Sequence, residues 1–228
     1  MKKQGACYIV GAGEFTPLYS TPAAEDYVIA ADGGYRYLQQ IDIHPDLVLG
    51  DFDSLPQKPQ HDNLIELPAE KDDTDMLYAL KVGLEKGFRI FYLYGGLGGR
   101  FDHTIANLQS LAFLSQNGAV GFLFGKEDVT TVLSGPSVCF DSGAEGYFSL
   151  FSFGEHCEGV CIRGLKYELE NASLCHTFPI GTSNEFIQKE SEITIAKGMA
   201  AMVFAQKNLA HIKRIEQRLD KQGKKGII

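Results

Sequence analysis

The chain has 228 residues, of which 44% are apolar and 22% are charged. This composition is typical of a globular protein and excludes a disordered chain, a collagen-like repeat and a disulfide-stapled miniprotein. The net charge of −8 argues against nucleic acid as the main partner, because phosphate backbones are bound by positively charged surfaces.

Six short apolar runs in the first part of the chain predict buried β-strands. They cover residues 6–10, 27–31, 46–49, 64–67, 89–94 and 120–124. Apolar residues at helical spacing predict three helices, over residues 35–41, 74–85 and 103–116. This alternation predicts an α/β fold over residues 1–133, in which a parallel sheet has helices on both faces.

The pattern changes after Leu133, where Gly and Pro interrupt the chain every few residues. Short apolar runs then predict antiparallel strands over residues 138–140, 147–153, 159–162, 173–176, 192–195 and 199–205. Residues 134–228 are therefore expected to form an all-β sandwich domain with a basic C-terminal tail. In that tail, residues 206–225 carry apolar residues on one helical stripe, which predicts a terminal helix that is either solvated or bound to a partner.

The apolar segments and the cysteines bear on the cellular compartment. No window approaches the roughly 18 apolar residues of a membrane span, and no apolar leader is found near the first residues. The five cysteines are an odd number without a CxxC pair, which predicts free thiols in the cytoplasm. Zinc-ligand types occur at His156, Cys157, Cys161, Cys175 and His176, but their spacing differs from the common zinc patterns and favours buried thiols.

Carboxylates follow four predicted strands in sequence. The segments are Ala31-Asp32-Gly33-Gly34, Gly50-Asp51-Phe52-Asp53-Ser54, Glu70-Lys71-Asp72-Asp73-Thr74-Asp75 and the stretch from Gly95 to His103. The carboxyl ends of parallel strands meet at one edge of a sheet, where all these carboxylates except a solvent-facing Asp73 are expected. On an extended segment Asp51 and Asp53 point the same way, which favours a Mg²⁺ ion bound together with phosphate oxygens. Thr74 is expected to cap the following helix, and Asp72 or Asp73 is the alternative capping residue.

A glycine-rich loop, Gly95-Gly96-Leu97-Gly98-Gly99-Arg100, lies between a predicted strand and a predicted helix. Such a loop lets backbone amides approach a phosphate closely, and Arg100 adds a charged contact. A tight crossover without a ligand is the alternative. Asp102 and His103 begin the helix, where His103 is either a hydrogen-bonding residue or a general base. Gly11-Ala12-Gly13 resembles the start of a dinucleotide fingerprint, but residue 16 is Thr, so a turn close to a nucleotide is favoured.

Taken together, these segments resemble the thiamine pyrophosphokinase family in its bacterial form. Their order and spacing match as a set, and the resemblance continues at Gly164-Leu165-Lys166-Tyr167 and at Gly181-Thr182-Ser183-Asn184-Glu185-Phe186. The resemblance implies an α/β nucleotide-binding domain followed by a β-sandwich domain, in a homodimer whose active sites lie between subunits. It also implies transfer of a pyrophosphoryl group from ATP to thiamine, giving thiamine diphosphate and AMP, with Mg²⁺ as cofactor.

The resemblance also implies roles for individual residues. The metal ligands would be Asp51, Asp53, Asp72 and Asp75, and the catalytic residues would be Asp51, Asp53, Asp75 and Arg100. ATP binding is implied for Asp32, Gly33, Gly34, Thr74, Gly96, Gly99, Arg100, Asp102 and His103, and thiamine binding for Thr182, Ser183 and Asn184. The chain has no Trp, so an aromatic contact to the thiamine ring would come from Phe or Tyr.

Three other functions are considered. In a phosphatase of the haloacid dehalogenase type, Asp51 would be the nucleophile and Asp53 the acid/base, but that motif normally follows the first strand of its domain and here it follows the third. A pterin pyrophosphokinase is a closer alternative, from which the Ser183-Asn184 loop distinguishes this chain. A module that senses nucleotide or thiamine without turnover is the non-catalytic alternative.

Overall fold

The computed structural model describes residues 5–53, 57–68, 70 and 72–217. The chain divides into unit 1, residues 1–114 and 119–126, and unit 2, residues 115–118 and 127–228. Two residues of the predicted motifs, Ser54 and Lys71, lie outside the described residues, as do residues 218–225 of the predicted C-terminal helix.

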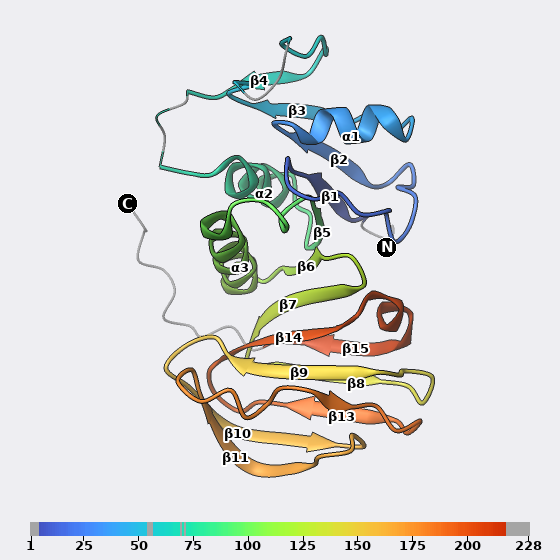
Figure 1. The fold of residues 1–228 in the computed structure, drawn as a ribbon, viewed down its shortest axis with the longest axis vertical. Helices are drawn as coiled ribbons and strands as arrows, with labels where there is room; N and C mark the ends of the chain where they lie inside the picture. Colours follow the sequence, from blue (N-terminus) through green and yellow to red (C-terminus); the bar gives the residue numbers. More distant parts are fainter. Residues whose placement is uncertain (1–4, 54–56, 69, 71, 218–228) are drawn as a thin grey trace. The chain divides into compact units, whose positions relative to one another are not determined.

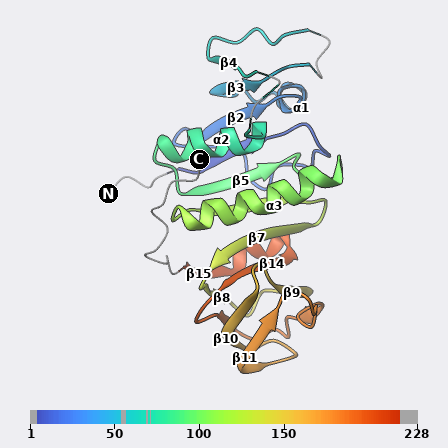
Figure 2. The same ribbon diagram turned by 90° about the vertical axis from the view of Figure 1, so that its left-hand side faces the viewer.

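Unit 1 contains a parallel sheet with the strand order β6-β5-β1-β2-β3-β4. Its strands are β1 (Cys7–Val10), β2 (Tyr27–Ala31), β3 (Leu47–Gly50), β4 (Leu64–Glu66), β5 (Ile90–Tyr94) and β6 (Val120–Phe124). Its helices are α1 (Gly34–Gln40), α2 (Asp75–Glu85) and α3 (Phe101–Gln116). Figures 1 and 2 show α1 on one face of this sheet and α2 and α3 on the other.

The packing of α2 on the sheet follows from its sequence. Thr74 caps the helix, because its Oγ1 accepts a hydrogen bond of 3.2 Å from the backbone N–H of Leu77. A Cβ atom at Gly83 would lie 2.5 Å from the Phe91 ring, so glycine lets the helix approach β5 closely. The start of α2 is thereby held at the carboxyl ends of the strands.

The other face of β1 and β5 carries a cluster of aromatic side chains. Tyr94 stacks on Phe124 with ring centroids 4.4 Å apart, and Tyr8 meets Tyr92 edge to face at 5.1 Å. The Tyr94 hydroxyl accepts a hydrogen bond of 3.1 Å from the backbone N–H of Tyr19, in the segment between β1 and β2. The segment between β1 and β2 therefore covers the aromatic side chains on this face of the sheet.

Unit 2 consists of two antiparallel layers and one 3₁₀ helix. One layer has the order β12-β9-β14-β7, with β7 (Asp128–Ser134), β9 (Tyr147–Ser152), β12 (Asn184–Glu185) and β14 (Met199–Ala205). The other has the order β11-β10-β13-β8-β15, with β8 (Ser137–Phe140), β10 (His156–Arg163), β11 (Leu169–Cys175), β13 (Ser191–Thr194) and β15 (Ile212–Glu216). Phe140 of the second layer contacts Phe148 and Phe204 of the first, which forms the apolar core between the layers.

The prediction of a helix over residues 206–225 is wrong for its described part. Residues Gln206–His211 form the 3₁₀ helix η1, and Ile212–Glu216 form β15, which pairs antiparallel with β8. The spacing of Leu209, Ile212 and Ile215 suits a helix, but the free edge of β8 offers backbone hydrogen bonds that the sequence pattern does not reveal.

The mixed α/β character with a further antiparallel sheet is confirmed. The sequence analysis assigned residues 127–133 to the first domain and predicted no strand there. In the structure these residues belong to unit 2, and β7 pairs along its whole length with β14. Among the described residues, no helix is long and apolar enough to cross a membrane.

Candidate functional site

A cleft of about 240 Å³ opens in unit 1 at the carboxyl ends of β1, β2 and β5. Seven of the predicted site residues line it, namely Asp32, Thr74, Asp75, Gly96, Gly99, Arg100 and His103. The first turns of α2 and α3 complete its wall. Residues far apart in the sequence are thus brought to one place by the parallel sheet, as expected for a ligand site in an open α/β fold.

Two aspartates of the cleft are held partly out of solvent. One carboxylate oxygen of Asp32 and one of Asp75 are buried. Asp32 has a left-handed backbone conformation, with a φ of +49°, and its N–H donates to the carbonyl of Leu49 at 2.7 Å. A Cβ atom at Gly50, whose φ is +149°, would lie 3.0 Å from the Asp32 Cα. Glycine therefore lets β3 pass close behind Asp32, and the strained backbone marks Asp32 as a candidate functional residue.

The other predicted metal ligands lie outside this cleft. Asp51 accepts a hydrogen bond of 3.2 Å from the N–H of Asp53, and Phe52 between them is buried with a φ of +61°. The segment is a turn and not the extended segment that the sequence analysis assumed for Asp51 and Asp53. Asp53 and Asp72 are exposed, which leaves Asp75 as the one predicted ligand among the residues that line the cleft.

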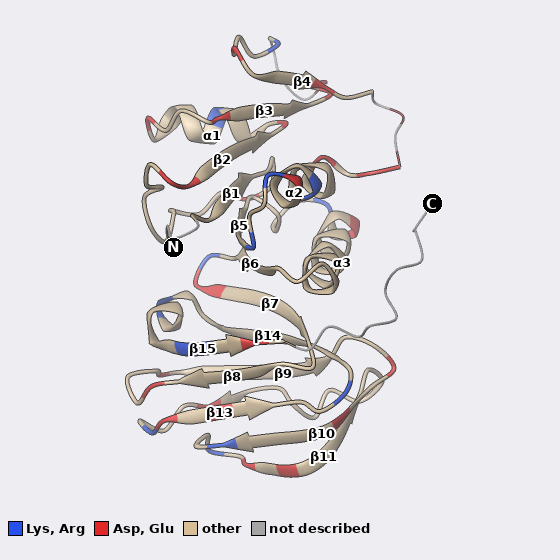
Figure 3. Cartoon of the chain, turned by 180° about the vertical axis from the view of Figure 1, so that it is seen from behind, with Lys and Arg blue, Asp and Glu red and all other residues tan. Residues whose placement is uncertain are grey.

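The sequence suggested that Asp73 faces solvent, but in the structure its side chain is paired. Both of its carboxylate oxygens accept hydrogen bonds from the Lys81 ammonium on α2, at 2.7 and 2.6 Å. Figure 3 shows the acidic residues along the connection from β4 to α2, and this ion pair neutralises one of them. The negative charge of Asp73 is therefore balanced by Lys81, and Asp73 does not line the cleft.

The glycine-rich loop is held by backbone contacts with the segment that follows β1. The N–H of Gly13 donates to the carbonyl of Gly95 at 2.8 Å, and the N–H of Glu14 donates to the carbonyl of Leu97 at 2.7 Å. A Cβ atom at Gly95, whose φ is +62°, would lie 2.2 Å from the carbonyl oxygen of Gly11. The two glycine segments thus pack backbone against backbone, which only residues without a side chain allow.

Arg100 and Asp102 form a two-pronged ion pair at the mouth of the cleft. Their contacts are Nε to Oδ1 at 3.2 Å and Nη2 to Oδ2 at 2.5 Å. The Arg100 hydrogen bond holds the pKa of the Asp102 carboxyl below its ordinary value. Both side chains are largely exposed, so the pair orients Arg100 more than it stabilises the fold. Asp102 itself does not line the cleft, whereas His103 does.

Gly33 and Gly34 lie at the start of α1 and do not line the cleft. A Cβ atom at Gly34 would lie 1.8 Å from the carbonyl oxygen of Val10, so this glycine is required for the packing of α1 against β1. The geometry therefore gives Gly34 a structural role.

The sequence analysis missed Asn107. This residue lies in α3, is buried, lines the cleft and donates a hydrogen bond of 2.7 Å to the carbonyl of Gly96. It lies four residues after His103 and therefore on the same helix face. A polar residue one turn beyond His103, within the apolar stripe of α3, was the signal that could have identified it.

The predicted thiamine-binding residues lie in unit 2, at the start of β12. Ser183 is exposed with a φ of +59°, and its N–H donates to Ser149 Oγ at 3.0 Å. Asn184 is buried and joins this segment to the backbone of Tyr167. Its Oδ1 accepts a hydrogen bond from the N–H of Tyr167, and its Nδ2 donates one to the Tyr167 carbonyl. The Thr182 hydroxyl donates to the carbonyl of Pro179 at 2.9 Å. Ser183 is thus presented to solvent, while Asn184 holds the chain beside it.

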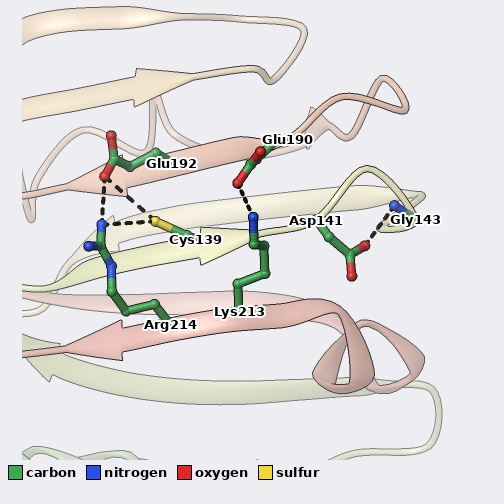
Figure 4. Close-up of polar contacts among 7 residues, drawn as sticks. All are labelled: Cys139, Asp141, Gly143, Glu190, Glu192, Lys213 and Arg214. Carbon is green, nitrogen blue, oxygen red and sulfur yellow. Dashed lines mark hydrogen bonds and ion pairs between the residues drawn. The ribbon is translucent and has the colours of Figure 1, made fainter.

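A second cavity, of about 460 Å³, lies on the second layer of unit 2 and contains none of the three predicted thiamine residues. Figure 4 shows its polar contacts, in which Lys213 pairs with Glu190 and Arg214 pairs with Glu192. Arg214 also donates to the sulfur of Cys139 at 3.2 Å. Lys213 and Arg214 of β15 thus pair across β8 with Glu190 and Glu192, just before and within β13, as is common on an exposed sheet face.

The described residues contain no group of three or more His, Cys, Asp or Glu side chains that could hold a metal ion. Mg²⁺, however, is commonly held by one or two carboxylates together with substrate phosphates and water. Asp32 and Asp75, each with a buried oxygen at the cleft, fit that type of site. The donor set of the cleft is therefore suited to Mg²⁺ brought by a polyphosphate, and not to a cage made by the protein alone.

Comparison with known proteins decides the family. The catalytic-domain model of thiamin pyrophosphokinase matches residues 20–121, and the model of its vitamin B1 binding domain matches residues 138–200. The chain belongs to the thiamine pyrophosphokinase family. The first matched region contains all the cleft residues on α2 and α3, and the second contains the Thr182-Ser183-Asn184 segment.

Curated and solved members of the thiamine pyrophosphokinase family resemble the chain over most of its length. The Bacillus subtilis thiamine pyrophosphokinase is 29% identical over 182 residues, which cover 77% of this chain and 85% of that protein. The crystal structure of the Bacillus subtilis protein matches with a TM-score of 0.81 and 26% identity, over 88% of this chain and 98% of that chain. The structure from Geobacillus thermodenitrificans matches with a TM-score of 0.76 and 28% identity, over 88% and 97%.

Proposed function

We propose that this chain transfers a pyrophosphoryl group from ATP to the hydroxyl group of thiamine, giving thiamine diphosphate and AMP. The observation that carries the proposal is the cleft of unit 1, which Asp32 and Asp75 line together with the glycine-rich loop and Arg100. A polyphosphate needs amide and guanidinium donors on one side and a carboxylate-bound cation on the other, and this cleft offers both.

Each unit has its own role in this proposal. Unit 1 is the proposed ATP-binding catalytic domain and unit 2 the proposed thiamine-binding domain, supported by the catalytic-domain model over residues 20–121 and the vitamin B1 binding-domain model over residues 138–200. Within the first domain, Asp32, Thr74, Gly96, Gly99, Arg100 and His103 bind ATP, supported by their place at the cleft. Gly33, Gly34 and Asp102 act by shaping α1 and orienting Arg100.

Mg²⁺ is the proposed cofactor, and when bound it neutralises polyphosphate charge and stabilises the leaving group. Asp75 is the ligand with geometric support, and Asp32 is a second carboxylate at the same cleft. Asp51, Asp53 and Asp72 remain proposed ligands from the family resemblance, on turns that follow β3 and precede α2.

The residues of the chain contribute mainly by positioning and by electrostatics. The glycine-rich loop presents backbone amides to phosphate oxygens, and Arg100 adds a delocalised positive charge where negative charge develops. Asp102 holds the Arg100 guanidinium in one orientation before substrate arrives. A cleft carboxylate accepts the proton of the thiamine hydroxyl as the oxygen attacks the β-phosphorus.

Thiamine is a cation, and the acidic segments of unit 1 attract it. In unit 2, Ser183 is the proposed direct contact, because its side chain is exposed on a turn of fixed geometry. Thr182 and Asn184 support that turn through their hydrogen bonds to Pro179 and Tyr167. The proposed aromatic contact to the thiamine ring comes from an exposed tyrosine or phenylalanine of this unit, such as Tyr147, Tyr167 or Phe178.

A measurement of AMP release tests the function. The purified chain is expected to form AMP and thiamine diphosphate only when thiamine, ATP and Mg²⁺ are all present. Phosphate release without an acceptor would instead indicate the phosphatase. AMP formation with a hydroxymethyl pterin but not with thiamine would indicate the pterin pyrophosphokinase, and binding without turnover would indicate a sensor.

A homodimer with active sites between subunits is the proposed assembly. Sedimentation equilibrium of the full chain is expected to give twice the monomer mass of 25.1 kDa. Mixing Asp75→Asn with Ser183→Ala is then expected to restore part of the activity at low thiamine concentration, because a shared site would combine one intact residue from each subunit.

A further inference from the structure

Three consecutive peptide groups of the glycine-rich loop have their carbonyl oxygens engaged by other parts of unit 1. The Gly95 carbonyl accepts from the N–H of Gly13, and the Leu97 carbonyl accepts from the N–H of Glu14. The Gly96 carbonyl, between them, accepts from the side chain of Asn107 at 2.7 Å. This middle peptide is thus the one of the three that depends on a side chain.

The orientation of these peptides determines what the loop offers to a ligand. In a trans peptide the C=O and the following N–H point in opposite directions. Fixing the carbonyls of Gly95, Gly96 and Leu97 therefore turns the N–H groups of Gly96, Leu97 and Gly98 the other way. Gly95 and Gly98 have positive φ angles, of +62° and +75°, which glycine adopts without strain and which let the loop turn sharply on both sides of these peptides.

Asn107 is well placed to control the middle peptide. It is 5% exposed, it belongs to α3, and it lines the cleft. Its partner is a carbonyl, which can only accept, so the amide nitrogen of Asn107 must face Gly96. A Cβ atom at Gly96 would lie 3.0 Å from this nitrogen and 2.6 Å from the Leu123 side chain, so the loop is closely fitted at this point.

On the basis of the proposed function, we propose that Asn107 is a positioning residue for the polyphosphate of the nucleotide. It holds the Gly96 carbonyl away from the bound phosphates and thereby presents the Leu97 N–H to them. Without Asn107 the peptide is free to turn, and its carbonyl dipole would then face negatively charged oxygens. The residue acts through the loop and does not need to touch the nucleotide.

The variant Asn107→Ala tests this inference. We expect a non-hydrolysable ATP analogue with Mg²⁺ to bind about tenfold more weakly, because a buried carbonyl loses its donor. Adenosine, which has no phosphate, is expected to bind as it does to the unaltered chain, and the KM for thiamine is expected to remain unchanged. Asn107→Asp is expected to weaken binding of the ATP analogue further, because a carboxylate cannot donate to Gly96 and repels phosphate.

The control is Ser110→Ala. Ser110 is buried in the same helix and donates to the carbonyl of Ala106 at 2.8 Å, but it does not line the cleft. The Ser110→Ala variant is expected to leave the affinity for the ATP analogue unchanged, because Ser110 lies outside the cleft lining. Equal losses for the ATP analogue and adenosine in Asn107→Ala would overturn the inference, because they would indicate a direct contact with the nucleoside.

The outcome for Asn107 is separable from that of the proposed function, because binding of the analogue is measured without turnover. If the unaltered chain forms no thiamine diphosphate but Asn107→Ala still loses affinity for the ATP analogue, the positioning role stands and the activity is wrong. If the unaltered chain is active and Asn107→Ala binds the analogue equally well, the positioning role is wrong.

Discussion

At the scale of single residues, the structure gives three aspartates of the predicted acidic segments three different environments. Asp75 has a buried oxygen at the cleft, Asp73 is paired with Lys81, and Asp53 is exposed on a turn. A spacing pattern in the sequence cannot distinguish these three environments, because each depends on which atoms of other segments lie nearby. Substitutions of the three residues should therefore differ in effect.

The variant Asp75→Asn is expected to lower kcat at least about a hundredfold while the fold is retained, because a lost metal ligand removes several kcal/mol of transition-state stabilisation. The matched control is Asp73→Asn. It removes the same charge two residues before Asp75, from a carboxylate that is already paired with Lys81. Steady-state rates of AMP formation measure both. Equal losses in the two variants would show that net charge, and not the position of Asp75, is what matters.

The residues of the thiamine segment are expected to respond differently as well. Ser183→Ala should raise the KM for thiamine more than the KM for ATP, because its side chain is exposed beside the bound ring in the proposed function. Asn184→Ala removes both side-chain hydrogen bonds to Tyr167 and should lower the free energy of unfolding by about 1–3 kcal/mol. Kinetics and chemical denaturation measure the two effects. A larger change in the KM for ATP would instead place Ser183 at the nucleotide.

At the scale of secondary-structure elements, the contact between β1 and β5 brings several tyrosines together under the segment that follows β1. Burial raises the pKa of Tyr92 to about 12, and it also raises the pKa values of Tyr8 and Tyr94. In the unfolded chain these phenols titrate near 10. Because the folded pKa is the higher one, the stabilisation from neutral tyrosines is complete below pH 10 and is lost as the pH rises towards 12.

An alkaline titration tests this cluster. The tyrosinate absorbance is expected to rise in two phases, with exposed tyrosines ionising first and the buried ones only when unit 1 unfolds. Tyr92→Phe keeps the ring but removes the ionising group, so it should move the unfolding midpoint to higher pH. A midpoint that does not move would show that Tyr92 does not limit alkaline stability.

The charged face of the second layer in unit 2 is expected to matter little for either stability or activity. Arg214→Ala breaks its contacts with Glu192 and Cys139, but the side chain is half exposed, so the free energy of unfolding should change little. The KM values for ATP and thiamine should not change, because the cavity beside Arg214 contains none of the proposed substrate residues. A raised KM for thiamine would contradict the assignment of the substrate site to the Ser183 segment.

At the scale of the whole molecule, charge and substrate chemistry are linked. The chain carries a net charge of −8 and thiamine is a cation, so long-range attraction should assist its capture. Raising the ionic strength from about 0.05 to 0.5 M is expected to raise the KM for thiamine severalfold, because screening shortens the reach of the field. An uncharged competitive inhibitor with the same ring system is the control, and its inhibition constant should change little.

The sequence alone determined the family, most strands and helices of unit 1 and the edge of the sheet at which the cleft lies. Periodicity and the residues after each strand are local properties, and a parallel sheet converts them directly into a common rim. The tertiary structure alone decided that the chain turns at Phe52, between Asp51 and Asp53, and that Lys81 forms an ion pair with Asp73. It also decided that residues 212–216 pair with β8 as a strand and that Asn107 supports the glycine-rich loop. Each of these depends on partners distant in the chain, whose approach no local pattern encodes.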